Sequence, residues 1–295
     1  MFQNISNYLL SIRVWQWLKN LVVFTLPIGV GTSDIGLLLV VLQSFFGVSF
    51  LSSSIYVFND IKDINSDRMH PVKKNRPIAS GSLKIKNATI FSFFLATVGL
   101  VSLYLINLNT FIVGLFYFIF GSFYTFKFKY VVYIDSLIIS ILFLIRVLVG
   151  SFAVNIRPSL FLILFITIFS FSLAVSKRIS ILIDSAISSE SNYKNFLIKV
   201  YDLDNLKIIL KISLIFSSFV YLSWVVNAGY ISSYNLPSLF LLSSVATLGR
   251  VFYGIYKLTI TSGLEDFVLS IIKSRDNLLF IILTLLLTFL GIYGS

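Results

Sequence analysis

Long apolar runs separated by short polar or charged segments form the dominant pattern of this sequence. A helix rises 1.5 Å per residue, so about 20 consecutive apolar residues suffice to cross a bilayer. Nine runs predict helices, at residues 18–31, 35–59, 85–107, 110–126, 132–154, 159–183, 204–227, 237–257 and 276–293. The first run is short and contains Pro27, which indicates a kinked or partial span.

The composition supports this interpretation. Of the 295 residues, 57% are hydrophobic and only 12% are charged, which excludes an ordinary soluble domain. Backbone groups in lipid must find partners within their own segment, and the runs lack the alternation of a membrane β-strand. We therefore expect an all-α polytopic membrane protein, a single domain over residues 1–295 that forms a nine-helix transmembrane bundle.

The basic residues are segregated among the connections. If the connections alternate sides from an inside N-terminus, 20 of the 23 basic residues fall in inside segments. These segments are residues 1–19, 60–86, 127–131, 177–211 and 257–275. The positive-inside rule then predicts a multi-pass protein of the cell inner membrane with a cytoplasmic N-terminus. It also explains the net charge of +11 without nucleic acid as a partner.

A cluster of carboxylates follows the second predicted helix, in the stretch "YVFNDIKDINSDRMHPVKKNRPIASG" from Tyr56 to Gly81. Asn59, Asp63 and Asp67 are spaced four residues apart, and Asp60 lies three residues before Asp63. If the helix continues past the bilayer, these side chains share one face. Their oxygens suit Mg²⁺, which often shares its ligands with phosphate.

Cations follow the carboxylates closely and could hold the remaining phosphate charge. They are Arg68, Lys73, Lys74, Arg76 and Lys84. The segment therefore predicts a site for Mg²⁺ and pyrophosphate. The alternative is a solvated loop that obeys the positive-inside rule. His70, the only histidine, is expected to be a loop residue.

The motif "NDIKDINSD", followed by "RP" and "SG", resembles the first aspartate motif of the UbiA prenyltransferase superfamily. The resemblance implies a membrane enzyme of about nine spans with a cytoplasmic active-site cavity. It also implies Mg²⁺ as the cofactor and a pyrophosphate-bearing donor. Aromatic prenyltransferases of this superfamily have a second acidic motif after the sixth span, where this chain has "LAVSKRISILIDSAISSE" with Lys177 and Arg178. A cationic site at this place favours a second anionic substrate.

Four other segments resemble the decaprenyl-phosphate phosphoribosyltransferase branch of the superfamily. They are "RVWQWLKNLVVFTLP", "KYVVYIDSLIISILFLIRVLVGS", "SKR" and "GLEDFVLSIIKSRDNLLF". This branch transfers 5-phosphoribose from phosphoribosyl pyrophosphate to a polyprenyl phosphate and releases pyrophosphate, for cell-envelope glycan precursors. One departure is that Ile181 and Leu182 stand where the branch commonly has a Glu.

Carried over to this chain, the resemblance implies a role for each of twelve side chains. Asn59 and Asp63 are expected to bind Mg²⁺, with Asp60, Asp63 and Asp67 as the catalytic aspartates. Tyr56 is expected to contact the donor. The donor's phosphates are expected to contact Lys19, Lys73 and Arg76. The other phosphates, including that of the lipid, are expected to contact Lys129, Arg146, Lys177 and Arg178. The expected partners are phosphoribosyl pyrophosphate, the polyprenyl phosphate and the membrane. The sequence leaves the oligomeric state open, with a homo-oligomer as one option.

Arg146 lies within a predicted span, where a charged side chain normally faces a cavity or a partner. Asp135 lies about three turns earlier and nearly on the same face, too far away for a direct ion pair. A ligand phosphate between the two is our hypothesis for this span.

Two other functions stay open from the sequence. The first is a prenyltransferase of the same fold that moves a prenyl group from a prenyl diphosphate to a quinone or haem precursor. The second is a polytopic lipid transporter, for which broken or charged helices at mid-membrane are expected in both halves.

Overall fold

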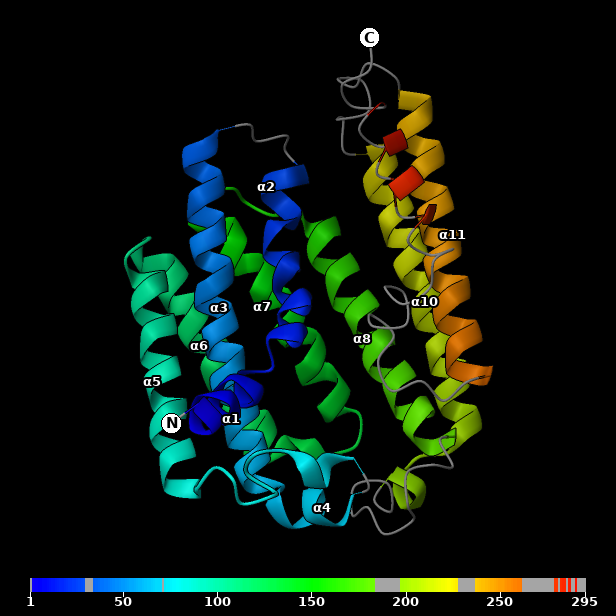
Figure 1. Cartoon of the computed structure of the whole chain (residues 1–295). Helices are drawn as coiled ribbons and strands as arrows, with labels where there is room; N and C mark the ends of the chain where they lie inside the picture. The colour runs from blue at the N-terminus through cyan, green and yellow to red at the C-terminus, as the bar shows by residue number, and fades with distance from the viewer. Residues whose placement is uncertain are drawn as a thin grey trace. The chain divides into compact units, whose positions relative to one another are not determined.

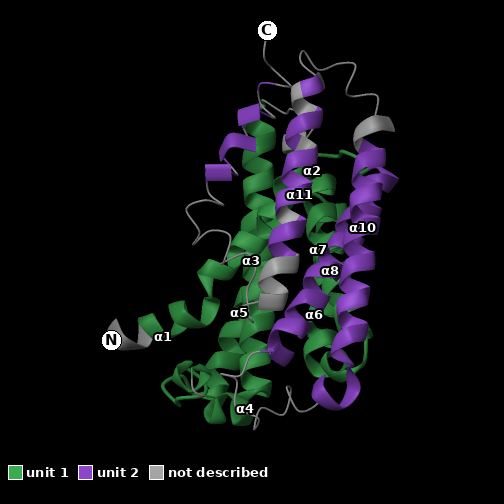
Figure 2. Cartoon of the chain, turned by 90° about the vertical axis from the view of Figure 1, so that its right-hand side faces the viewer, with its two compact units in different colours: residues 1–158, 187–196 green, residues 159–186, 197–295 purple. Residues whose placement is uncertain are grey.

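The computed structural model describes residues 2–29, 34–70, 72–183, 197–227 and 237–261, with short pieces between 279 and 290 (Figure 1). The chain divides into two compact units, which are described separately (Figure 2). The first comprises Met1–Pro158 with Ile187–Phe196, and the second comprises Ser159–Ala186 with Leu197–Ser295. The described residues form helices and no strand, as predicted.

The first unit contains seven α-helices and three 3₁₀ segments within its described residues. They are α1 (Phe2–Ile12), η1 (Val14–Phe24), α2 (Thr25–Gly29), α3 (Ile35–Lys62), α4 (Ile64–Met69), η2 (Lys73–Asn75), α5 (Ile85–Tyr104), α6 (Leu108–Phe126), η3 (Phe128–Tyr130) and α7 (Ile134–Ala153). The second unit contains α8 (Leu160–Ile183), α10 (Leu203–Asn227) and α11 (Pro237–Thr261).

Six of the described helices are long and apolar enough to cross a membrane: α3, α5, α6, α7, α8 and α10. They match six of the nine predicted spans to within a few residues. A shorter apolar stretch, Leu241–Ile255, lies in α11. Most of the predicted ninth span lies outside the described residues. The nine-helix count therefore stays a prediction.

The predicted first span at residues 18–31 is not one α-helix over its described residues, as its short length and Pro27 indicated. The chain forms the 3₁₀ segment η1, and only then the short helix α2. Backbone that departs from the α-helix needs other partners at membrane depth. Buried Asn20 of η1 donates to the Ser49 hydroxyl of α3 at 3.0 Å, and Trp17 donates to the Ser53 hydroxyl at 3.0 Å. These polar side chains fasten η1 to α3.

Helix α3 lies at the centre of the first unit and packs against α5, α6, α7 and η1. Glycine residues allow two close approaches between elements of this unit. A Cβ added at Gly99 of α5 would lie 2.8 Å from the Gly47 carbonyl oxygen of α3. A Cβ at Gly150 of α7 would lie 1.9 Å from the Val23 carbonyl oxygen of η1.

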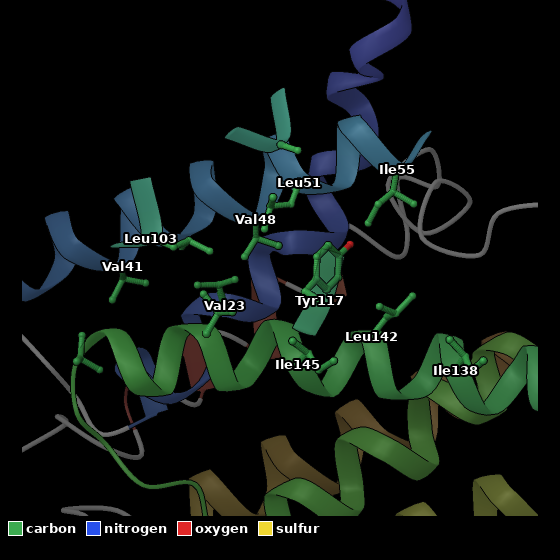
Figure 3. Packing of buried hydrophobic residues seen from close by; sticks show 13 residues of the cluster. Val23, Val41, Val48, Leu51, Ile55, Leu103, Tyr117, Ile138, Leu142 and Ile145 are labelled. Atoms are coloured by element: carbon green, nitrogen blue, oxygen red, sulfur yellow. The ribbon is translucent and has the colours of Figure 1, made fainter. Parts of the chain in front are cut away.

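The apolar core lies between these helices. Figure 3 shows Tyr117 of α6 between Leu51 of α3 and Ile145 of α7, with Val23 of η1 near the same layer. Tyr117 is 2% exposed, so its hydroxyl group requires a partner inside the protein. That partner belongs to the site described next.

Candidate active site

The aspartate motif interrupts its helix. Helix α3 ends at Lys62, Asp63 has φ −88° and ψ 7°, and α4 begins at Ile64. The condition that the helix continues unbroken through Asp67 is therefore not met. Helix-type hydrogen bonds still link the turns, from the Asp63 N–H to the Asn59 carbonyl at 2.9 Å and from the Asp67 N–H to the Asp63 carbonyl at 2.8 Å. Helix α4 lies at the opposite end of α3 from α2 (Figure 1).

Asp60 and Asp67 share one arginine. The Arg76 Nη1 atom donates to Asp60 Oδ1 at 3.0 Å and to Asp67 Oδ2 at 2.6 Å. Asp60 is 3% exposed and Asp67 is 4% exposed, so these ion pairs are largely shielded from water. Arg76 was predicted to hold the donor's phosphates, and the structure brings it against two of the three motif carboxylates.

A second guanidinium reaches the same carboxylate. Arg13 Nη2 donates to Asp60 Oδ1, and the Arg13 guanidinium lies 5.6 Å from the centre of the Tyr56 ring. Arg13 has φ 55° and ψ 53°, a left-handed conformation that is uncommon for residues other than glycine. Sequence reasoning counted Arg13 as a basic residue of the inside segment and as the first residue of a segment that resembles the phosphoribosyltransferase branch, but gave it no role in the site. Its contact spans 47 positions of the chain, so no local pattern could have revealed it.

Asp63 has a different partner. Lys129 Nζ donates to Asp63 Oδ2, and both side chains are 14% exposed. The adjacent Lys62 donates to the carbonyl oxygens of Thr125 and Phe126, at the end of α6. These contacts fasten the end of α3 to the α6–α7 connection. The structure thus brings a predicted metal ligand and a predicted phosphate contact together.

The loop after α4 is ordered by side chains. His70 Nδ1 accepts hydrogen bonds from the backbone N–H groups of Val72 at 3.1 Å and Lys73 at 3.3 Å. Arg68 Nε donates to the Ala79 carbonyl at 3.0 Å. His70 is a loop residue, as predicted. It helps to fix the loop that carries Lys73 and Arg76.

Burial raises the pKa of the Asp67 carboxyl above its ordinary value, although Arg76 beside it acts in the opposite direction. The Asp67–Arg76 pair therefore carries a desolvation cost.

The oxygen donors fit Mg²⁺ only if a ligand completes its coordination. Within the described ranges, no group of three or more His, Cys, Asp or Glu residues could hold a metal ion alone. Asn59 and Asp63 lie one helical turn apart at the end of α3, and both are part-exposed. Such a small set of protein oxygens suits Mg²⁺, which binds through one or two carboxylates together with waters and substrate phosphates.

A second polar cluster lies deeper in the first unit, around Arg146. Its Nε donates to Asn20 Oδ1 at 2.8 Å, and its Nη2 donates to the Tyr117 hydroxyl at 2.7 Å. The Ser52 hydroxyl lies 2.9 Å from that of Tyr117. Arg146 does face partners inside the protein, as expected for a charged residue within a span. Asp135 accepts from the backbone N–H of Ser136 at 2.6 Å.

The remaining predicted residues are distributed over both units. Lys19 is half-buried on η1 in the first unit. Lys177 is exposed and Arg178 is buried on α8 in the second unit. The roles of these three residues as phosphate contacts stay predictions, and so does the cytoplasmic cavity.

Comparison with known proteins identifies the family. The family model described as "UbiA prenyltransferase family" matches residues 21–270. The chain belongs to the UbiA prenyltransferase family. The matched range includes the aspartate motif, Arg146 with Tyr117 and Ser52, and Lys177 with Arg178. The predicted family is therefore confirmed.

Curated relatives of this UbiA family chain include decaprenyl-phosphate phosphoribosyltransferases. The one from Mycolicibacterium smegmatis is 32% identical over 179 residues, which cover 59% of this chain and 56% of the relative. The chain spans about half the length of the curated phosphoribosyltransferases that it matches. The family and these relatives support the prediction of a transferase.

Solved structures share the fold of this UbiA family member. A structure described for digeranylgeranylglyceryl phosphate synthase superposes with a TM-score of 0.63 and 24% identity, covering 99% of both chains. A UbiA homologue from Archaeoglobus fulgidus bound to GPP and Mg²⁺ gives a TM-score of 0.62 at 14% identity, covering 97% of this chain and 98% of that one. At these identities the likeness establishes the all-helical fold alone.

Proposed function

We propose that the protein transfers 5-phosphoribose from phosphoribosyl pyrophosphate to a polyprenyl phosphate with the help of Mg²⁺. The reaction takes place at the end of α3, on the cytoplasmic side of the inner membrane, and its product serves cell-envelope glycan synthesis. One observation carries the proposal: the motif carboxylates hold Arg76 and Lys129 at the same helix end as Asn59 and Asp63. Oxygen donors for a metal and cations for phosphate are thus assembled in one place.

The residues have separate tasks in this reaction. Asn59 and Asp63 hold Mg²⁺, which supplies charge neutralisation at the pyrophosphate when it is bound. Arg76, Lys129 and Lys73 bind the pyrophosphate oxygens and stabilise the charge that develops as this group leaves. Asp60 and Asp67 position Arg76. Lys177 and Arg178 receive the phosphate of the lipid.

The substitution occurs at C1 of the ribose. The bond between C1 and the pyrophosphate oxygen breaks, and pyrophosphate leaves with the electron pair, which gives the ribose oxocarbenium character. An oxygen of the lipid phosphate forms the new bond to C1. This oxygen is already ionised at neutral pH, so the reaction requires no general base.

The test is the release of pyrophosphate by purified protein in detergent. We expect release from phosphoribosyl pyrophosphate only when both Mg²⁺ and a polyprenyl phosphate are present. A prenyl diphosphate with an aromatic acid as acceptor is the rival pair, because the Archaeoglobus homologue of the same fold binds GPP. Prenylation of the aromatic acid without consumption of phosphoribosyl pyrophosphate would show that the proposal is wrong.

Asp63→Asn is expected to reduce pyrophosphate release at least 100-fold, because it removes the only charged metal ligand of the pair. Asp204→Asn is the matched control. Asp204 lies on α10, its side chain is 82% exposed, and it pairs with Lys207. The control should keep full activity. Equal activity of the Asp63→Asn variant and the wild type would remove Asp63 from the mechanism.

A further inference from the structure

Helix α1 has one face on the protein and another face that no part of the first unit covers. On the inner face, the ring of Tyr8 meets the ring of Phe91 of α5 edge to face, with ring centres 4.9 Å apart. On the outer face, Leu9 is 57% exposed and Leu10 is 62% exposed. Two adjacent leucines on a short helix at the end of the chain therefore require something apolar outside the unit.

Helix α1 meets α3 at the depth where the surface of the bilayer is expected. A hydrocarbon core that starts at Ile35 ends about 20 residues later, near Ser54. The hydroxyl group of the preceding Ser53 donates to the Ile12 carbonyl at the end of α1, at 2.8 Å. Helix α1 extends outward from α3 and α5 instead of running along them (Figure 2). It therefore lies along the bilayer surface, on the same side as the aspartate motif.

The charge beside α1 is positive. Asn7 of α1 donates to the Ser82 carbonyl at 3.5 Å, and two exposed lysines follow at the start of α5, Lys84 and Lys86. Neither lysine takes part in an ion pair found within the described ranges. The chain has no carboxylate side chain before Asp34. Cations beside an apolar helix face are typical of a surface that binds anionic lipids.

We propose that α1 and the start of α5 form a docking surface for the headgroups of anionic phospholipids. This α1 lipid surface consists of Leu9, Leu10, Trp15, Lys84 and Lys86. The leucines lie at the boundary of the acyl chains, and Trp15, which is 51% exposed, lies at the headgroup level that tryptophan prefers. The two lysines bind the lipid phosphates. The inference goes beyond the proposed function, because it does not depend on which donor or acceptor reacts.

A second copy of the chain fits this surface less well than lipid does. In a two-fold contact the same patch faces itself, so Lys84 and Lys86 of one copy would approach the same lysines of the other. Like charges at such a contact are repulsive, whereas anionic headgroups neutralise them.

The depth of α1 can be measured on the full chain reconstituted into vesicles of phosphatidylcholine and phosphatidylglycerol. Since the chain lacks cysteine, a nitroxide label on Leu10→Cys is the only one present. Its accessibility to oxygen, which partitions into lipid, is compared with its accessibility to a water-soluble nickel complex. Phe94→Cys on α5 is the lipid control, and Asp204→Cys is the water control, with wild-type side chains that are both largely exposed. We expect the Leu10 label to have an oxygen-to-nickel ratio between those of the two controls.

The preference for headgroups is measured by energy transfer from a fluorophore on Leu10→Cys to labelled lipids. At low salt, we expect phosphatidylglycerol to be enriched over phosphatidylcholine about fivefold around α1, and salt should reduce this enrichment. Lys84→Gln combined with Lys86→Gln should lower the enrichment to about twofold or less, because both headgroup charges are removed. Lys84→Arg combined with Lys86→Arg is the matched control and should keep it. The salt titration requires neither substitution and tests the same claim if the glutamine variant does not fold.

Three results would overturn the proposal. A Leu10 label as accessible to nickel as the Asp204 control would place α1 in water. Equal energy transfer to both lipids at low salt would show that no anionic headgroup is bound. A label shielded from both reagents, with energy transfer between labels on separate copies, would show that a second copy covers α1. Each of these results leaves the proposed transfer reaction untouched, because none of them involves its substrates.

Discussion

The three motif aspartates differ in what they contact. Asp60 and Asp67 are buried and bind Arg76, whereas Asp63 is part-exposed and binds Lys129. The sequence spacing predicted that Asn59, Asp63 and Asp67 share one face if the helix continues. The helix is interrupted at Asp63, where α4 starts, although helix-type hydrogen bonds still link the turns. The proposed function therefore assigns Asp63, with Lys129 beside it, to the metal and assigns the other two aspartates to the positioning of Arg76.

Arg13 is the residue whose importance emerges only from the structure. Arg13→Gln removes one of the two guanidinium groups on Asp60 and is expected to lower the free energy of unfolding by about 1.5–3 kcal/mol. Binding of pyrophosphate should weaken several-fold, because Arg76 is then drawn towards Asp60. Denaturant unfolding in detergent and calorimetry measure these two effects.

Arg157→Gln is the control for Arg13→Gln. Arg157 is exposed in the α7–α8 connection and makes none of the ion pairs found among the described residues. We expect it to behave like the wild type. An Arg13→Gln variant that matches the wild type in both measurements would contradict the role given to Arg13.

At the scale of elements, hydrophobic run length predicted α3, α5, α6, α7, α8 and α10 well. It failed for η1, where tertiary contacts determine the backbone. Buried Asn20 and half-buried Trp17 donate to serines of α3, and Gly150 lets α7 approach the η1 backbone. Single-sequence patterns carry no information about partners more than a hundred residues away, such as Asn20 and Arg146.

Gly150→Ala tests the packing of η1 against α7. The new methyl group would lie 1.9 Å from the Val23 carbonyl oxygen, so backbone must shift, and we expect a loss of about 1–3 kcal/mol in the free energy of unfolding. Gly249→Ala in α11 is the matched control, because nothing lies within 4 Å of its added methyl group.

The control should be neutral or more stable by up to about 1 kcal/mol, since alanine favours a helix more than glycine does. Thermal unfolding in detergent compares the two variants. Two equally stable variants would show that the approach of α7 to η1 has been misjudged.

At the scale of the whole molecule, the charge distribution predicts which ends of the helices face the cytoplasm. The chain contains no cysteine, so a single introduced cysteine reports its own position without background. Ser82 precedes α5 and Asn109 follows it, and both side chains are exposed. In intact cells, a membrane-impermeant thiol reagent should label Asn109→Cys and should label Ser82→Cys only after permeabilisation.

Labelling of Ser82→Cys in intact cells would place the aspartate motif on the outer side. Phosphoribosyl pyrophosphate would then be unavailable to the site, because the positive-inside orientation is what gives the site access to cytoplasmic donors.

The central claim is that a sugar phosphate, and not a prenyl group, is transferred at the end of α3. The mass of the lipid product tests this claim most directly. Purified protein is incubated with Mg²⁺ and with both substrate pairs together, which are phosphoribosyl pyrophosphate with a polyprenyl phosphate and a prenyl diphosphate with an aromatic acid. The account predicts a polyprenyl phosphate heavier by one phosphoribosyl group, with no such product from Asp63→Asn. A prenylated aromatic acid, with the polyprenyl phosphate unchanged, would contradict it.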